Sequence, residues 1–360
     1  MTSGTILVVG ATGGVGRHVV RCAVEAGLHP RALVRSTERA ARLLPVETEL
    51  LAGEATMPVD MARALEGADG VILAHGSHGA PGEAEAVDYG IVRVLVECLL
   101  ASGHPVRVTL MSALGVTVHD SQHDRVTGLA TWKHRAERLL RVSGLPCTIV
   151  RPGWFDYEAQ DEHRLVARQG DGRRGGSPVD GAISREQLAR VLLAAHTTAD
   201  ATGLTLEVVA ERGPEQSQLD SLFAGLRADV PGEVDGALEP DTLPLGAEPD
   251  RVLEDLRRVA AAADAREAGA VTARVAGPET AARPPSSEHR APRTAHRDRG
   301  PRTEDRGAGS RSSRSRASRR PRPHHDGGTG PARRRTAQLT AGSRWCPAPR
   351  RGSSAHHPWP

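Results

Sequence analysis

The sequence predicts an α/β fold with a doubly wound parallel sheet, and three observations carry that prediction. The chain opens on Ile6 to Val9, an apolar and mostly β-branched run that is typical of a central strand buried on both faces of a sheet. Strand-like and helix-like apolar patterns then alternate repeatedly to about residue 150. Past residue 264 apolar residues become scarce, so the folded part is expected to end there.

Each expected element has its own local pattern. Strands are expected where short apolar runs end in small or polar residues, at 6–9, 31–35, 48–51, 70–76, 106–111, 147–150 and 203–209. Helices are expected where apolar residues recur every three or four positions, at 14–26, 58–66, 83–102, 129–142, 184 onward, 215–228 and 249–263. Gly27 is placed to end the first helix, and Ser184 to Gln187 forms a capping box.

Composition divides the chain into two parts. Residues 1–264 are expected to form one folded domain, whose C-terminal segment, about 154–264, covers a substrate. Residues 265–360 hold 21 arginines against 7 acidic residues and are rich in Pro, Ser and Gly, so we expect a disordered tail. The net charge of +3 therefore reflects the tail, and the folded domain is acidic.

The tail is expected to add no binding function. Its arginine-rich run, 311–322, is of the kind that contacts nucleic-acid phosphates, but no aromatic residues are interleaved for base stacking. We therefore favour an inert tail or a read-through product over a nucleic-acid-binding tail. The chain has no apolar run of the roughly twenty residues that a membrane span needs, and its first strand begins at the N-terminus. We expect no membrane contact, no signal peptide and a cytoplasmic location.

The first strand runs directly into three spaced glycines, Gly10, Gly13 and Gly16. In a Rossmann-type fold the first glycine permits a tight turn, the second lets backbone N–H groups approach a diphosphate, and the third lets the next helix pack against the strand. The alternative, a glycine-rich turn without a ligand, fits poorly between a buried strand and an amphipathic helix. The residues predicted to hold a dinucleotide here are Gly10, Ala11, Thr12, Gly13, Gly14, Val15 and Gly16.

The end of the second strand predicts which coenzyme binds. A coenzyme without a 2′-phosphate is usually held by an acidic residue about 20 residues past the glycines. Arg35 and Ser36 stand there instead, and a guanidinium suits a phosphate better than a neutral diol. We therefore predict NADP(H) in preference to NAD(H), with a solvated arginine at a strand end as the alternative.

Further coenzyme contacts are expected where later strands end. Glu54 follows the third strand and is placed to accept a hydrogen bond from the adenine amine. The fourth strand ends in Ala74-His75-Gly76, beside which a nucleotide can lie. Because His75 and His78 have no carboxylate or cysteine beside them in this loop, we interpret both as solvent-facing and predict no metal site.

Candidate catalytic groups follow the fifth strand and lie in the next long helix. Ser112 stands at the carboxyl end of that strand, the edge where doubly wound sheets bind ligands. Lys133 is the only lysine among 47 Lys and Arg residues, and a compact ammonium is not interchangeable with a guanidinium. We interpret it as functional, the alternative being a solvated lysine retained by chance. The aromatic cluster 154–157 is expected to close a pocket, and the polar loop 163–176 to cover the substrate.

These motifs together resemble a known family. Over about residues 4–260 the chain resembles an atypical short-chain dehydrogenase/reductase of the NmrA-like, NAD(P)H-binding group, in its glycine turn and in Arg35, Asp88-Tyr89-Gly90, Ser112, Lys133, Ser143-Gly144-Leu145 and Arg151-Pro152-Gly153. The resemblance implies an NAD(P)-binding Rossmann domain with Pro152 and Gly153 on the coenzyme. It also implies that Ser112 orients a carbonyl group and that Lys133 holds the nicotinamide ribose.

The family pattern is broken at one position. In these reductases a tyrosine four residues before the lysine exchanges a proton with the substrate, and Leu129 stands there in this chain. The candidate substitutes are Tyr157, His123 and Tyr89. General acid catalysis is worth about 10²- to 10⁴-fold, so a protein without a substitute would bind coenzyme and turn over slowly.

Two functions therefore stand open. The first is an NADP(H)-dependent oxidoreductase that reduces a small carbonyl, imine or quinone-like compound by hydride transfer. The second is an NADPH-binding regulator or redox sensor without efficient turnover. The expected partner is a small-molecule substrate, and the chain is expected to be a monomer or a homodimer.

Overall fold

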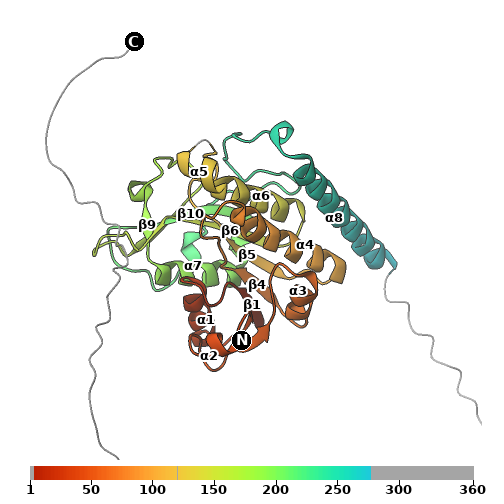
Figure 1. The fold of residues 1–360 in the computed structure, drawn as a ribbon, viewed down its shortest axis with the longest axis horizontal. Coiled ribbons are helices and arrows are strands. Elements are labelled where there is room, and N and C mark those ends of the chain that lie inside the picture. Colours follow the sequence, from red (N-terminus) through yellow and green to blue (C-terminus); the bar gives the residue numbers. More distant parts are fainter. Residues whose placement is uncertain (1–3, 120, 277–360) are drawn as a thin grey trace, which may run out of the picture. The chain divides into compact units, whose positions relative to one another are not determined.

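The computed structural model describes residues 4–119 and 121–276, and its strands form one sheet (Figure 1). The strand order is β3-β2-β1-β4-β5-β6-β10-β9-β7, with β8 paired to β10 outside this path. The strands are β1 Thr5–Val9, β2 His29–Val34, β3 Glu49–Ala52, β4 Gly70–Leu73, β5 Arg107–Met111, β6 Cys147–Pro152, β7 Trp154–Phe155, β8 Arg164–Arg168, β9 Ala182–Ile183 and β10 Leu204–Glu211. Neighbouring strands from β3 to β6, and β6 with β10, run parallel. The predicted Rossmann-type α/β fold is confirmed.

Helices cover both faces of this sheet. They are α1 Gly16–Glu25, α2 Thr37–Ala41, α3 Pro58–Leu65, α4 Gly90–Ser102, α5 Gln122–Thr127, α6 Leu129–Val142, α7 Arg185–Thr197 and α8 Asp250–Ala276. Alternate side chains of β1 explain the two layers. Leu7 and Val9 pack with α3, α4, α6 and α8, whereas Ile6 and Val8 pack with α1, α2 and α7. Among the described residues, no helix is both long and apolar enough to cross a membrane.

One predicted loop is a strand. Residues 163–176 were expected to form a polar cover, but Arg164–Arg168 forms β8, antiparallel to β10. Leu165 is buried in the core, whereas Arg164 and Arg168 both form ion pairs with Glu211 on β10. Arg164 and Arg168, whose polarity favours a loop, are therefore the solvent-facing residues of β8, and both bind a carboxylate on the neighbouring strand. Only tertiary pairing with β10 makes this polar segment extended.

The C-terminal part also differs from its prediction. Residues 215–228 hold a single 3-10 turn, Asp220–Leu222, instead of a helix. Tertiary contacts hold the segment: the Gln216 side chain hydrogen-bonds the backbone of Leu165 on β8 at 2.8 Å, and Leu219 and Phe223 are buried. Helix α8 continues past residue 264, where the folded domain was expected to end. The domain boundary stays a prediction, and the tail from residue 277 onward lies outside the described residues.

Candidate active site

The glycine turn after β1 has the geometry that its sequence predicts. Gly10 has a φ of +82°, and a Cβ there would lie 2.7 Å from the backbone nitrogen of His75. The Gly13 N–H donates to the Gly10 carbonyl at 2.9 Å, and a Cβ on Gly16 would overlap that same carbonyl oxygen. A side chain at position 10 or 16 would therefore collide with the backbone, and the turn could not keep this shape. The shape fits a diphosphate cradle at the start of α1.

The other residues of the turn divide by burial. Ala11 and Val15 are buried in the core below α1 and offer a ligand only their backbone groups. Thr12, Gly13 and Gly14 are exposed. The exposed half of the turn is therefore free for a ligand.

The residues predicted at the adenine end lie together and exposed. Because Val34 and Ala52 pair in register, Arg35, Ser36 and Glu54 follow neighbouring strand ends. The Ser36 hydroxyl accepts a hydrogen bond from the backbone of Arg39 and caps α2, so a coenzyme would compete for it. Arg35 has no recorded partner among the described residues, which leaves its guanidinium available to a phosphate.

A buried ion pair lies at the carboxyl edge of the sheet. Nζ of Lys133 on α6 is 2.7 Å from Oδ1 of Asp88, and the two side chains are 11% and 1% exposed. Burial raises the pKa of Asp88, but the Lys133 ammonium outweighs burial and holds that pKa below its usual value. A Cβ on Gly76 would lie 3.9 Å from the same Nζ. The sole lysine is therefore fixed next to the loop that follows β4.

The prediction that His75 faces solvent is wrong, whereas His78 is exposed as expected. His75 is buried because the backbone after β4 is pressed against the glycine turn, with Ala74 N–H bonded to the Val9 carbonyl. Burial lowers the pKa of His75 to about 4, so its ring is neutral at pH 7. Its Nδ1 is buried and has no hydrogen-bond partner in the described part of the chain.

Ser112 presents a second unpaired buried atom. Its N–H continues the sheet by donating to the Val150 carbonyl at 2.8 Å, whereas its Oγ is buried without a partner in the described residues. Buried polar atoms are normally hydrogen-bonded, and the polar groups of a ligand would supply the partners that these two atoms lack. Ser112 Oγ and His75 Nδ1 therefore fit the polar groups of a bound coenzyme or substrate.

None of the predicted tyrosine substitutes has a recorded contact with Lys133 or Ser112 in the described structure. The Tyr89 hydroxyl donates to Asp255 on α8 at 2.8 Å, and burial together with that hydrogen bond raises its pKa. Tyr157 and His123 are exposed. Leu129, at the start of α6, has no proton to exchange. The structure thus holds Lys133 in its pair with Asp88 and Ser112 at the end of β5, and neither contacts a tyrosine among the described residues.

Pro152 and Gly153 are built into the sheet. The Pro152 carbonyl accepts the Leu114 N–H at 3.0 Å, and the Gly153 N–H donates to Val208 at 2.9 Å. A Cβ on Gly153 would lie 2.5 Å from the Gly181 carbonyl oxygen. Their packing accounts for both residue types, and their coenzyme role stays a prediction.

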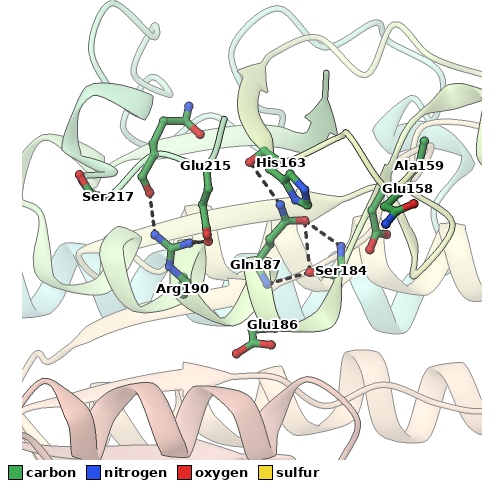
Figure 2. A pocket seen from close by; sticks show the side chains of 11 residues that line it. Glu158, Ala159, His163, Ser184, Glu186, Gln187, Arg190, Glu215 and Ser217 are labelled. Atoms are coloured by element: carbon green, nitrogen blue, oxygen red, sulfur yellow. Dashed lines mark hydrogen bonds and ion pairs between the residues drawn. The ribbon is translucent and has the colours of Figure 1, made fainter. Parts of the chain in front are cut away.

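The aromatic cluster 154–157 is largely open to solvent. Trp154 and Tyr157 are 41% and 66% exposed and make an edge-to-face contact, with ring centroids 6.4 Å apart. The nearby hollow in Figure 2, about 680 Å³, is lined instead by mostly polar residues of α7 and of two flanking loops, Glu158, Ala159, Gln160, His163, Ser184, Glu186, Gln187, Arg190, Glu215, Gln216 and Ser217. The closing role of the aromatic cluster stays a prediction.

A buried charge network on α6 was missed by the sequence analysis. Residues 229–248, here called the strap, contribute carboxylates that pair with α6. Glu248 accepts from Arg135 at 2.6 Å and from Arg138 at 2.8 Å, and Glu239 accepts from Arg141 at 2.9 Å. Charged residues on a helix normally mark its solvent face, so no local pattern predicts that a distant segment covers them.

One corner of this network has the spacing of a metal site. Ligand atoms of His134, Asp235 and Glu239 lie within 4.8 Å of one another. Guanidinium groups already compensate both carboxylates, since Arg138 donates to Asp235 and Arg151 donates to Glu239. We interpret the group as part of the ion-pair network. The expectation that the protein has no metal site stays a prediction.

Comparison with known proteins identifies the family of this chain. An NAD(P)H-binding family matches residues 10–199, slightly more than half of the chain. The chain belongs to this NAD(P)H-binding family. The predicted resemblance to atypical short-chain dehydrogenases/reductases of the NmrA-like group is confirmed, and the chain carries an NAD(P)H-binding domain.

The relatives differ in their described roles. The chain is 27% identical over 284 residues to Protein TIC 62, chloroplastic, of Oryza sativa, covering 70% of this chain and 54% of that one. It is 29% identical over 193 residues to the uncharacterized sugar epimerase YhfK of Bacillus subtilis, covering 52% and 86%. The chain thus spans about half the length of the rice relative and most of the bacterial one.

Solved structures share the fold. An NAD-dependent epimerase/dehydratase, by its description, from Bacillus halodurans superposes with a TM-score of 0.52 at 22% identity, covering 62% of this chain and 100% of that one. The oxidoreductase ylbE from Lactococcus lactis gives 0.51 at 18% identity, covering 63% and 100%. At these identities the likeness shows the fold alone.

Proposed function

We propose that this protein is an NADPH-dependent reductase of a small carbonyl, imine or quinone-like compound. The observation that carries the proposal is the buried Lys133–Asp88 pair, set near the glycine turn on the carboxyl edge that also holds the unpaired buried atoms of Ser112 and His75. Burying an unpaired ammonium is unfavourable, and the Asp88 carboxylate offsets that cost by pairing with it. The pair therefore keeps an ammonium donor in a fixed place at the edge where this fold binds its coenzyme.

The chain's own residues would divide the work. A bound nicotinamide coenzyme would supply the hydride, and solvent water would supply the proton that completes the reduction. The Ser112 hydroxyl donates a hydrogen bond to the oxygen of the substrate, and Lys133 donates to a ribose hydroxyl while stabilising negative charge nearby. Asp88 positions Lys133, and neutral His75 neither repels the ammonium nor attracts water as a charged ring would.

A second candidate function is an NADPH-binding regulator or redox sensor. Leu129 favours it because leucine cannot exchange a proton, and so does Tyr89, whose hydroxyl is committed to Asp255. This candidate predicts tight coenzyme binding with no oxidation by any acceptor. As further proposals, the partner is a small molecule, and sedimentation of the chain should give a monomer or a homodimer.

The test combines binding with turnover. NADPH fluorescence titration should give a saturable signal, and a panel of carbonyls, imines and quinones should then reveal NADPH oxidation above background. Lys133→Ala should weaken NADPH binding and remove oxidation, because the ribose loses its donor. Since that variant leaves Asp88 buried and unpaired, Lys133→Met combined with Asp88→Asn removes both charges and separates a binding defect from a folding defect.

The outcomes are distinct. Oxidation that disappears in both variants supports the reductase. Saturable binding without oxidation across the panel favours the sensor. Binding of neither NADPH nor NADH by the folded protein rejects both functions.

A further inference from the structure

We propose that Arg185, at the start of α7, binds the diphosphate of the coenzyme by exchanging its ion pair with Asp156 for one with the phosphates. The inference rests on the proposed function, because it takes the glycine turn as the diphosphate site. It adds a binding residue from the C-terminal half of the chain to that site.

The first observation is that Arg185 lies against the glycine turn. A Cβ on Gly14 would lie 2.8 Å from Nε and 3.1 Å from Cδ of Arg185. Glycine at position 14 therefore leaves the space that the arginine side chain occupies. The two residues are 171 positions apart and meet because α1 and α7 pack together on one face of the sheet (Figure 1).

The second observation is how the guanidinium is held. It forms an ion pair with Oδ2 of Asp156, and the backbone N–H of Arg185 donates to Oδ1 of the same carboxylate at 3.1 Å. Its Cζ lies 5.0 Å from the centre of the Phe155 ring, within cation–π distance. The aromatic cluster thus contributes a support for Arg185, whose side chain remains 37% exposed.

The third observation concerns Asp156 itself. Its φ is +61°, in the left-handed region, and its N–H donates to the Ile183 carbonyl at 3.1 Å. A residue other than glycine stays in this conformation when its surroundings hold it there. The backbone of Asp156 therefore stays beside Arg185. Its carboxylate pairs with the Arg185 guanidinium while no coenzyme is bound, and the diphosphate replaces it when the coenzyme binds. A diphosphate accepts two parallel guanidinium hydrogen bonds as a carboxylate does, and it carries more charge.

The surroundings are open and suit an anion. A hollow of about 420 Å³ lies at this point and is lined by Gly14, Arg17, His18, Asp156, Ser184, Arg185 and Glu186. Glu186 is already paired with Arg21 at 2.8 Å. Arg17 is exposed beside the turn and adds positive potential. Gly14 and Arg185 therefore line the same hollow, so a ligand bound at the turn can contact the Arg185 guanidinium.

The experiment measures binding of two ligands that share a diphosphate, NADPH and ADP-ribose, by calorimetry. Arg185→Gln should raise the Kd of both by about tenfold, as expected for losing one charge-assisted hydrogen-bonded contact. Asp156→Asn should lower both Kd values, because it removes the competing carboxylate while asparagine still tolerates a positive φ. Arg190→Gln is the matched control, since it removes the same charge from α7 at an ion pair with Glu215, and it should leave both Kd values unchanged.

The two variants are thus expected to change Kd in opposite directions, whereas the loss of a purely structural ion pair would change Kd in the same direction in both. If Arg185→Gln and Asp156→Asn weakened binding in parallel, or if Arg185→Gln bound both ligands as tightly as the wild type, the exchange would be refuted while the proposed function stood. An effect on NADPH without one on ADP-ribose would also overturn it. A wild-type protein that binds neither ligand would reject the proposed function itself. Circular dichroism melting of each variant confirms that it is folded.

Discussion

At the scale of single residues, coenzyme choice depends on Arg35. Its side chain is exposed at the carboxyl end of β2, and no partner is recorded for it among the described residues. Arg42, by contrast, is paired with Glu38. A guanidinium without a partner at this position is what a 2′-phosphate requires.

We predict that Arg35→Asp reverses the coenzyme preference. The Kd for NADPH should rise by roughly ten- to a hundredfold, the equivalent of a lost charged hydrogen bond of about 1.5–3 kcal/mol, whereas NADH should bind as well or better. Parallel titrations with both coenzymes measure the effect. Arg42→Asp makes the same charge change a few residues away and should leave the ratio of the two Kd values unaltered. An unchanged ratio in Arg35→Asp would count against the phosphate assignment.

At the scale of elements, α6 depends on the strap for its stability. From Lys133 to Val142 every residue of α6 is buried, including three arginines and one glutamate. The strap covers these charges with Asp235, Glu239 and Glu248. Removing one partner of a buried ion pair leaves an uncompensated charge and costs more than the pair contributes.

We predict that Glu248→Gln lowers the free energy of unfolding by about 3–5 kcal/mol, because it leaves the Arg135 and Arg138 guanidiniums without their shared carboxylate. Urea denaturation at pH 7 measures the change. Glu233→Gln is the control, since it alters an exposed residue of the same strap and should change stability by no more than about 0.5 kcal/mol. Equal effects of the two substitutions would mean that the network is not energetically important.

At the scale of the whole molecule, buried titratable groups set the pH dependence of folding. Burial lowers the pKa of His75 and His196 to about 4, so each contributes a loss of stability as pH falls from 6.5 towards 4. Burial raises the pKa of Glu207 to about 7 despite the attraction of Arg151. Its raised pKa gives a contribution that is fully present below pH 4.5 and is lost as pH rises through 7.

We predict that Glu207→Gln stabilises the protein at pH 8 but not at pH 5. At pH 5 the folded protein already holds Glu207 protonated, and glutamine has the same shape and charge. At pH 8 the wild type bears the cost of a buried carboxylate, which a shift of this size puts at up to about 3 kcal/mol. Urea denaturation at both pH values gives the difference. Glu211→Gln, on the solvent side of β10, should show no such gain, and a Glu207→Gln difference that did not grow with pH would disprove the assignment.

Several features followed from local pattern. The glycine turn was predictable because its φ angles and close contacts admit only glycine at positions 10 and 16. The bounds of α6 matched the periodicity of its apolar residues, and the capping box at Ser184 begins α7 as expected. Lys133 could be singled out by its rarity. Its pairing with Asp88 is not predictable from local pattern, because it joins two elements 45 residues apart.

The sequence by itself determined the doubly wound sheet and the position of the glycine turn, because apolar periodicity and glycine spacing within short stretches of chain indicate both. It also marked Lys133 by its rarity and Ser112 by its place at a strand end as candidate site residues. Only the tertiary structure decided that Arg164 to Arg168 pairs as a strand, that His75 is buried, that the strap covers the charges of α6, and that Arg185 lies on Gly14. These features come from contacts between distant segments, and the free energy of such contacts overrides the local preference of polar residues for solvent.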